Sequence, residues 1–272
     1  MSAQAVTILV LGAVVMLGIG CSVWVLAPAF QGRDAARRDL GSHRLEFGGW
    51  LTSLVLIGLI SVPATLVVRV GPDLTLNTFA LSALATDVPL LIFIYVRLIM
   101  PGALTWTELG LKPLPLGYVV TMGLGGGVAG LIVIGAIGEL LSQLGLGTNQ
   151  LEQFRFVLQE GPLALVVFLL AAAVMAPFVE ELFFRGFLFG VYCRRQPVWL
   201  AYLVSSVLFT ILHLEPNRMT VQQMAGLSMG IFLLALLLAW LYHYTGSLYP
   251  GMVAHAVNNA TAALLFYLMS PR

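Results

Sequence analysis

Charged residues are the component that this sequence lacks most. They make up 9% of its 272 residues, whereas hydrophobic residues make up 60% and the mean hydropathy is +0.98. A soluble domain carries about 25% charged residues, so the composition indicates an integral membrane protein surrounded by a lipid bilayer. The formal net charge is +1 and Lys112 is the single lysine. The sequence therefore has no basic patch that would indicate nucleic acid as a partner.

Cysteine is also scarce, and neither repeats of the solenoid type nor low-complexity tracts occur. Cys21 and Cys193 are far apart in sequence, and each lies within or beside an apolar run. Neither a disulfide framework nor a cysteine-based metal site follows from such a pair. The segment 31–46 is the only long charged loop, and its acidic and basic residues alternate as on a solvated surface.

Long apolar runs are what the sequence has in place of charge. A membrane-spanning helix needs about 20 apolar residues, because each residue rises ~1.5 Å against a ~30 Å hydrocarbon core. Eight runs qualify: 5–30, 48–70, 78–100, 116–144, 161–192, 197–213, 222–243 and 247–269. The fold class expected is an all-α polytopic membrane helix bundle of about eight transmembrane helices. The first run is too long for the core of a signal peptide and no basic residue precedes it, so we interpret it as a retained helix.

Basic residues gather in alternate loops. The first loop holds four arginines, the third holds Lys112 beside Arg97, and the fifth holds Arg194 and Arg195, whereas each other loop holds about one. Positively charged loops mark the cytoplasmic side of a membrane protein. The pattern predicts that the odd loops are cytoplasmic and that both termini lie outside.

Two features of the apolar runs invite a functional interpretation. The fourth run is rich in glycine, and Gly123/Gly127 and Gly126/Gly130 form small-xxx-small pairs that favour close helix packing over ligand binding. The acids Asp87 and Glu139 lie within predicted spans. Either could serve in a proton relay, but we favour a polar contact between helices, or a headgroup-level position for Glu139.

The segment 177–186 places two carboxylates and an arginine in one of the most apolar parts of the chain. An ionised group at the bilayer centre costs roughly 2.5–3.5 kcal/mol on insertion scales, so such groups are paired, hydrated or protonated. Glu181 and Arg185 are four residues apart and can pair on one helix face. Glu180 is rotated by about 100° from Glu181 and faces elsewhere. Burial beside a like charge suits Glu180 to act as a general base.

Two further polar clusters lie on later predicted helices. Phe209 and His213 are one turn apart, as are His255 and Asn259, whereas Asn258 faces elsewhere. Each cluster alone has a structural explanation, as an ion-pair staple or as hydrogen bonds between helices. The three together favour a site, because their side chains need partners within hydrocarbon and the most economical partners are each other and Glu180.

These motifs resemble those of a known family. Glu180-Glu181-x-x-x-Arg185, Phe209-x-x-x-His213 and His255-x-x-x-Asn259, in that order on successive helices, resemble the CPBP family. That family groups the type II CAAX prenyl endopeptidases with the bacterial Abi proteins, also called bacteriocin-processing or self-immunity proteases. Three further short segments are also similar to the family: Arg185-Gly186, Ser247-Leu248-Tyr249-Pro250 and Glu108-Leu109-Gly110-Leu111.

The resemblance covers about residues 105–270 and implies two regions and a set of roles. Residues 1–104 would form variable N-terminal transmembrane helices, and residues 105–272 a CPBP/Abi-like catalytic helix bundle. Glu180 would activate water with His213 as its partner, and His255 and Asn259 would donate hydrogen bonds to the oxyanion. The remaining motif residues would orient and line the site: Glu181, Arg185 and Phe209.

The resemblance also implies a membrane endopeptidase, multi-pass and of a prokaryotic inner membrane, that acts on a peptide or a lipidated protein. We favour water activation without a metal, although Glu180, His213 and His255 could form an open three-ligand zinc set. Two other functions remain open at this point. One is a non-catalytic immunity or scaffold protein that binds a peptide partner, and the other is a proton-coupled transporter that uses Asp87, Glu139 and Glu180.

Overall fold

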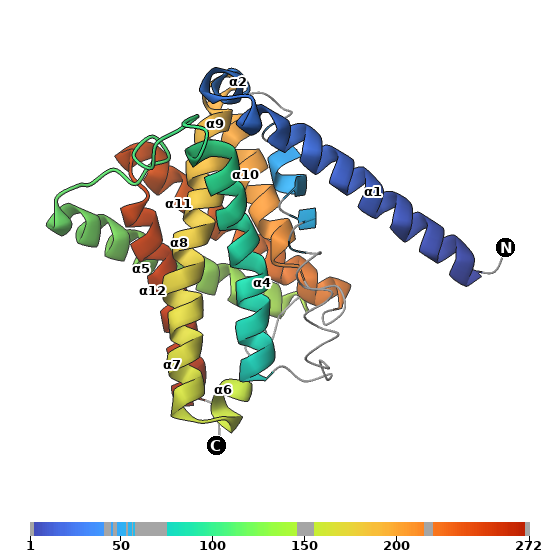
Figure 1. Cartoon of the computed structure of the whole chain (residues 1–272). Helices are drawn as coiled ribbons and strands as arrows, with labels where there is room; N and C mark the ends of the chain where they lie inside the picture. The colour runs from blue at the N-terminus through green and yellow to red at the C-terminus, as the bar shows by residue number, and fades with distance from the viewer. Residues whose placement is uncertain are drawn as a thin grey trace.

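The computed structural model describes residues 3–40, 45, 48–52, 54–55, 57, 75–145, 155–214 and 220–269. Within these ranges helices are the only regular secondary structure, and they pack into a bundle from which α1 extends to one side (Figure 1). The all-α class predicted from the apolar runs is therefore confirmed. The helices are α1 (Ala3–Phe30), α2 (Arg33–Arg38), α4 (Leu76–Ile94), η1 (Tyr95–Ile99), α5 (Leu116–Gln143), α6 (Phe156–Gln159), α7 (Pro162–Leu170), η3 (Ala171–Met175), α8 (Ala176–Glu180), η4 (Glu181–Phe189), α9 (Gly190–Tyr192), α10 (Val198–Leu212), α11 (Val221–Thr245) and α12 (Tyr249–Met269).

The described residues contain five helices that are long and apolar enough to cross a membrane. They are Leu76–Ile99, Leu116–Gln143, Pro162–Tyr192, Val221–Thr245 and Tyr249–Met269. The predicted number of about eight is not confirmed. The run 48–70 lies mostly outside the described residues, and the run 197–213 forms a helix of 15 residues. That helix is only about 22 Å long, shorter than the ~30 Å hydrocarbon core.

The helix that carries the two glutamates is continuous from residue 162 to residue 192 but not uniformly α-helical. Two π-helical stretches, η3 and η4, flank the short α8 that contains Pro177. A proline has no N–H to donate to the preceding turn, and wider π turns accommodate such an interruption. Pro177, inside an apolar run, predicts a bend just before Glu180, and in the structure the helical winding changes from π to α before Pro177 and back to π directly after Glu180.

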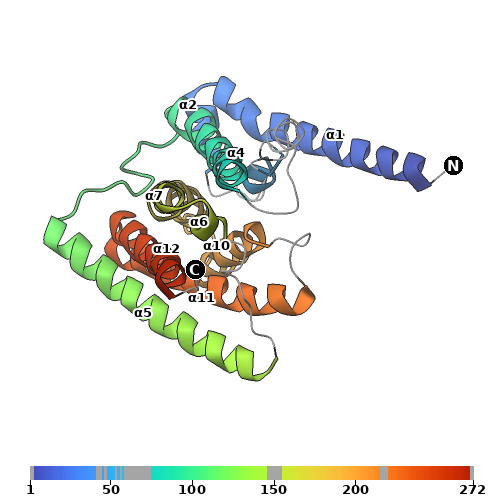
Figure 2. The same cartoon turned by 90° about the horizontal axis from the view of Figure 1, so that it is seen from below.

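The glycines of α5 let this helix approach α12 and α11 closely, as their spacing predicts. An added Cβ at Gly127 would lie 2.7 Å from the Val257 side chain, and one at Gly126 would lie 2.7 Å from Leu241. Figure 2 shows α5 lying along the outside of the bundle against these two helices. Gly125 faces away from them, with nothing within 4 Å of its would-be Cβ.

Buried Arg97 joins the first helices to α4 and η1. Its Nε donates to the carbonyl oxygen of Val25 (2.8 Å), its Nη1 to that of Ala36 (3.4 Å) and its Nη2 to the Asp39 carboxylate (3.1 Å). A guanidinium with several acceptors is tolerated where a bare charge would be costly. Arg97, predicted from sequence as a loop-edge charge, is therefore a structural anchor.

Loops that the charge pattern assigned to one side of the membrane do meet at one end of the bundle. Arg37 of α2 lies 3.0 Å from Glu108, and the Leu248 N–H donates to the Gly110 carbonyl oxygen (2.9 Å). Hydrogen bonds from Thr105 hold the pKa of the Glu108 carboxyl below its usual value. The grouping of these loops supports the predicted alternation, and their assignment to the cytoplasm stays a prediction.

Candidate active site

Glu180 and Glu181 end α8 and begin η4, so one helix delivers both carboxylates to the interior. Glu181 Oε1 lies 2.9 Å from Arg185 Nη1, and both side chains are fully buried. This ion pair is the one predicted from the four-residue spacing. Arg185 Nη2 also donates to the Ala235 carbonyl oxygen (3.1 Å). This hydrogen bond connects η4 to α11.

Phe209 of α10 covers the buried cation. The Arg185 guanidinium carbon lies 4.4 Å from the centre of its ring, an arrangement in which the negative face of the ring stabilises a positive charge. The same ring packs edge to face against Phe184, with 5.0 Å between centroids. Ser205, one turn earlier on α10, donates to the Phe184 carbonyl oxygen (3.0 Å) and fixes α10 against η4.

His213 follows directly after α10, and the end of that helix orients its ring. Its Nδ1 lies 2.8 Å from the Phe209 carbonyl oxygen. Because a carbonyl oxygen can only accept, Nδ1 carries the proton and donates it, and the Nε2 of the neutral ring presents a lone pair. This Nε2 lies 3.8 Å from Glu180 Oε2.

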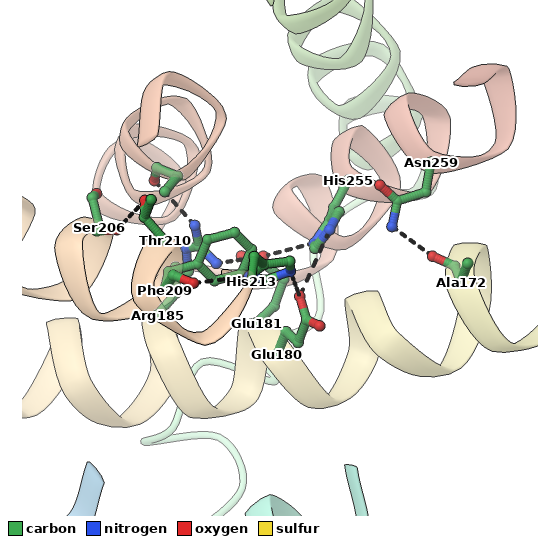
Figure 3. A network of polar contacts seen from close by, with 11 residues as sticks. Ala172, Glu180, Glu181, Arg185, Ser206, Phe209, Thr210, His213, His255 and Asn259 are labelled. Atoms are coloured by element: carbon green, nitrogen blue, oxygen red, sulfur yellow. Dashed lines mark hydrogen bonds and ion pairs between the residues drawn. The ribbon is translucent and has the colours of Figure 1, made fainter. Parts of the chain in front are cut away.

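His255 of α12 is oriented in the same way by a carboxylate. Its Nδ1 lies 3.2 Å from Glu181 Oε1, and its Nε2 lies 3.8 Å from Glu180 Oε2 (Figure 3). The sequence indicated Glu180 and the other polar cluster residues as partners of His255, and the contact with Glu181 was not predicted. It makes Glu181 the shared partner of Arg185 and His255, and not only the counter-ion of the arginine.

Three acceptor atoms therefore converge when both imidazoles are neutral. They are Glu180 Oε2 and the two Nε2 atoms, and Oε2 is buried with no hydrogen-bond partner among the described residues. The 3.8 Å separations are too long for direct hydrogen bonds. A donor such as water placed between the carboxylate and an imidazole would satisfy both, and a buried polar site of this kind commonly holds one.

A cavity of about 640 Å³ opens onto this cluster and is lined by residues from nine of the described helical segments. Most of its wall is apolar, and its polar lining includes Glu180, His213 and His255. Pockets of this size with a few convergent polar groups are typical of sites for small molecules or short chain segments. The structure thus brings these three predicted residues together at one wall of a single cavity.

The two asparagines of α12 differ from expectation. Asn259 lines the cavity, but its Nδ2 donates to the Ala172 carbonyl oxygen (2.6 Å) rather than to the Glu180 cluster. Figure 3 shows its side chain directed to η3. Asn258 also lines the cavity, and its Nδ2 donates to the Gly127 and Ala254 carbonyl oxygens (3.2 and 2.9 Å). It therefore anchors α12 to α5, a contact that the motif spacing did not reveal.

The two other acids predicted to lie within the membrane, Asp87 and Glu139, occupy different environments. Asp87 of α4 is 3% exposed and lines the same cavity as Glu180. Glu139 of α5 is exposed, and its carboxylate accepts from Gln143 one turn later (3.0 Å). Glu139 is not among the cavity-lining residues, which removes it from any relay with Asp87 and Glu180 through this space. The sequence signal for Asp87 was its position within a span, without an indication of what it faces.

The described side chains do not form a ready zinc site. Ligand atoms bound tetrahedrally to zinc at about 2.0–2.2 Å stand roughly 3.3–3.6 Å apart, somewhat less than the 3.8 Å between Glu180 Oε2 and each Nε2. In the described part of the chain, no group of three His, Cys, Asp or Glu side chains has an arrangement that would hold a metal ion.

Comparison with known proteins agrees with the motifs. Residues 162–261 match the family model described as type II CAAX prenyl endopeptidase Rce1-like. This region of the chain is therefore similar to the CPBP family. The matched region runs from the start of α7 into α12 and contains all seven residues of the three CPBP motifs. Asp87 and the glycine-rich α5 lie outside it.

A curated bacterial protein is similar to part of the chain. The chain is 24% identical over 133 residues to "Putative membrane peptidase YdiL" of Bacillus subtilis (strain 168), an alignment that covers 49% of each protein. The chain thus spans about half the length of the curated relative that it matches. No solved structure matches the chain.

Proposed function

We propose that this protein is an intramembrane endopeptidase that hydrolyses a peptide bond near or within the membrane. The observation that carries the proposal is the convergence of Glu180 Oε2 with the Nε2 atoms of His213 and His255, each at 3.8 Å, at the wall of a cavity inside an apolar bundle. An acid and two oriented imidazoles around a space for water are the groups that general-base hydrolysis needs.

In this proposal Glu180 and His213 activate the attacking water. A water between them donates one hydrogen to Oε2 and the other to Nε2, which leaves its oxygen lone pairs free. As that oxygen bonds to the peptide carbonyl carbon, Glu180 takes the proton, and the carbonyl oxygen becomes an oxyanion. When the C–N bond breaks, the same proton passes to the leaving nitrogen, and a carboxylic acid and an amine are released.

His255 and Asn259 are the proposed oxyanion donors, and the structure sets a condition for each. The Nδ1–H of His255 is engaged by Glu181, so His255 donates from Nε2 only when the ring is doubly protonated. Asn259 uses one N–H for Ala172, and the second N–H of its amide is left for the oxyanion.

The proposed substrate is a peptide or a lipidated protein segment, cleaved either at a CAAX-type C-terminus or during peptide maturation. The apolar wall of the cavity supports a substrate that enters from the bilayer. The proposed location is a prokaryotic inner membrane, which agrees with the Bacillus origin of the relative.

Replacement of Glu180 tests the proposal. We expect Glu180→Gln to lower the rate of peptide release by at least about 100-fold, the lower end of the range for a general base, without loss of membrane insertion or of the folded state. The assay compares membrane peptides, by mass spectrometry, between cells that carry the native chain and cells that carry the variant. Phe178→Leu, an exposed change two residues earlier on the same helix, is the control.

Full activity in Glu180→Gln and in His213→Ala would contradict the proposal. Retained binding of a peptide without cleavage by the native chain would favour a scaffold role instead. With purified protein, a chelator should leave hydrolysis intact. Loss that added zinc restores would show that the proposed metal-independent mechanism is wrong.

A further inference from the structure

Asp87 belongs to the same cavity as the proposed catalytic residues, although it comes from the N-terminal region outside the family match. The residue is 3% exposed, and it lines the cavity with Glu180 and His255. No hydrogen bond or ion pair joins it to another residue in the described part of the chain. A buried carboxylate that faces a cavity without a partner is a group available to a ligand.

Apart from the imidazoles of His213 and His255, the ionisable side chains that line the cavity are acidic. Among its described lining residues, Asp87 and Glu180 are acidic and none is lysine or arginine. The nearby cation, Arg185, does not line the cavity, because it is bound to Glu181 and covered by Phe209. An acidic cavity with apolar walls attracts a cation and repels an anion more strongly than the same charges would in water.

Residues of α4 line a path through the cavity to the Asp87 carboxylate. Ser82, Thr86 and Asp87 all line the cavity, and along this order they are exposed, half-buried and buried. Thr86 donates its hydrogen to the Ser82 carbonyl oxygen (3.1 Å), so its hydroxyl oxygen faces a ligand only as an acceptor. Acceptors along the path and a carboxylate at its deep end match an ammonium or guanidinium group, which has only donors.

We propose that Asp87 is a cation-binding subsite of this cavity, which accepts a lysine or arginine side chain, or an amine, of a bound peptide. The same subsite disfavours a free C-terminal carboxylate. Of the two proposed substrate classes it therefore favours peptide maturation over a CAAX-type C-terminus, with an internal segment that has a basic residue near the bond to be cut. As a statement about substrate choice this inference rests on the proposed peptidase function. The predicted preference for binding a basic peptide can be measured whether or not the protein cleaves that peptide.

Binding of three synthetic peptides tests the subsite. The probes are a blocked apolar hexapeptide with one internal lysine, its norleucine counterpart, and the norleucine peptide with a free C-terminal carboxylate. The full chain carries Glu180→Gln, so that binding is measured without cleavage and with Asp87 as the remaining cavity acid. We expect the lysine peptide to bind about tenfold or more tightly than the norleucine peptide, as for a hydrogen bond to a charged group, and the carboxylate peptide to bind most weakly.

Variants of Asp87 in that background decide the assignment. Asp87→Asn should reduce the lysine preference to within about twofold, Asp87→Glu should retain it, and Glu139→Gln, which removes a membrane acid outside the cavity, should leave it unchanged. Equal binding of the lysine and norleucine peptides, or a preference that survives Asp87→Asn, overturns the proposal. The affinity for the norleucine peptide reports folding, and Asp87→Ser replaces Asp87→Asn if that affinity is lost. If the native chain hydrolyses no peptide, the proposed peptidase function is wrong. The affinity for the lysine peptide relative to that for the norleucine peptide would still test the subsite.

Discussion

At the scale of single residues, the two imidazoles of the site have their orientation fixed from behind. His213 is held by the Phe209 carbonyl oxygen of its own helix, and His255 by Glu181 of a different helix. Both contacts engage Nδ1, so both rings turn Nε2 to Glu180. Rings that are held through one nitrogen keep the other in a defined protonation state, which is what a proton-transfer site requires.

Two adjacent serines of α10 offer a residue-scale prediction about how this wall is held. Ser205 Oγ donates to the Phe184 carbonyl oxygen, whereas the buried Ser206 Oγ has no hydrogen-bond partner among the described residues. We expect Ser205→Ala to destabilise the protein by about 1 kcal/mol, because a buried hydrogen bond is lost. Ser206→Ala should be neutral or stabilising. Unfolding midpoints in detergent check the pair, and equal effects of both variants would contradict the expectation.

Sequence periodicity predicted some residue contacts and not others. The Glu181–Arg185 pair lies within one helix, so a four-residue spacing was enough to find it. The motifs also predicted that Glu180, His213 and His255 would meet. The partners of Asn258 and Asn259 were not predictable, because they are backbone carbonyls of α5 and η3 that any residue type would supply. The place of Asp87 depends on how α4 packs against α8, and no local pattern encodes that.

At the scale of helices, α5 provides a matched pair of glycines. Gly127→Ala would place a Cβ 2.7 Å from Val257 and 3.3 Å from the Ala254 carbonyl oxygen, whereas Gly125→Ala meets nothing within 4 Å. We expect the first change to destabilise the α5–α12 contact by about 1–3 kcal/mol through overpacking. The second should be stabilising by up to about 1 kcal/mol through helix propensity.

Thermal unfolding of the two glycine variants in one detergent measures the difference. Because α12 carries His255, Gly127→Ala should also lower hydrolysis more than Gly125→Ala does. Indistinguishable unfolding midpoints would show that α5 and α12 are not in close contact in the membrane.

Apolar runs predicted where helices lie but not how each is wound. The run 161–192 corresponds to the continuous segment 162–192, and the run 116–144 to α5 within one residue at its C-terminal end. The π-helical turns at 171–175 and 181–189 were not predicted beyond a bend at Pro177. Hydrophobicity measures burial in lipid, and it carries little information on whether a carbonyl bonds four or five residues ahead.

At the scale of the whole molecule, the arrangement of loops predicts a topology. Thr107 lies in the loop that contacts α2 through Glu108, and Gln159 ends α6 at the opposite end of the bundle (Figure 1). In a chain with Cys21 and Cys193 replaced by alanine, we expect a membrane-impermeant maleimide to label Gln159→Cys in right-side-out vesicles. Thr107→Cys should react only after permeabilisation, because basic loops stay in the cytoplasm. Labelling of both positions from outside would contradict this topology.

The ion pair of Glu181 and Arg185 has a consequence for how the chain enters the bilayer during synthesis. Its two members stand one turn apart on a single segment, so they neutralise each other as soon as that segment coils. Ala235 and His255, their later partners, have not yet left the ribosome at that moment. Glu180 has no cation of its own on this segment. It therefore has no polar partner until the helices that carry His213 and His255 are in place.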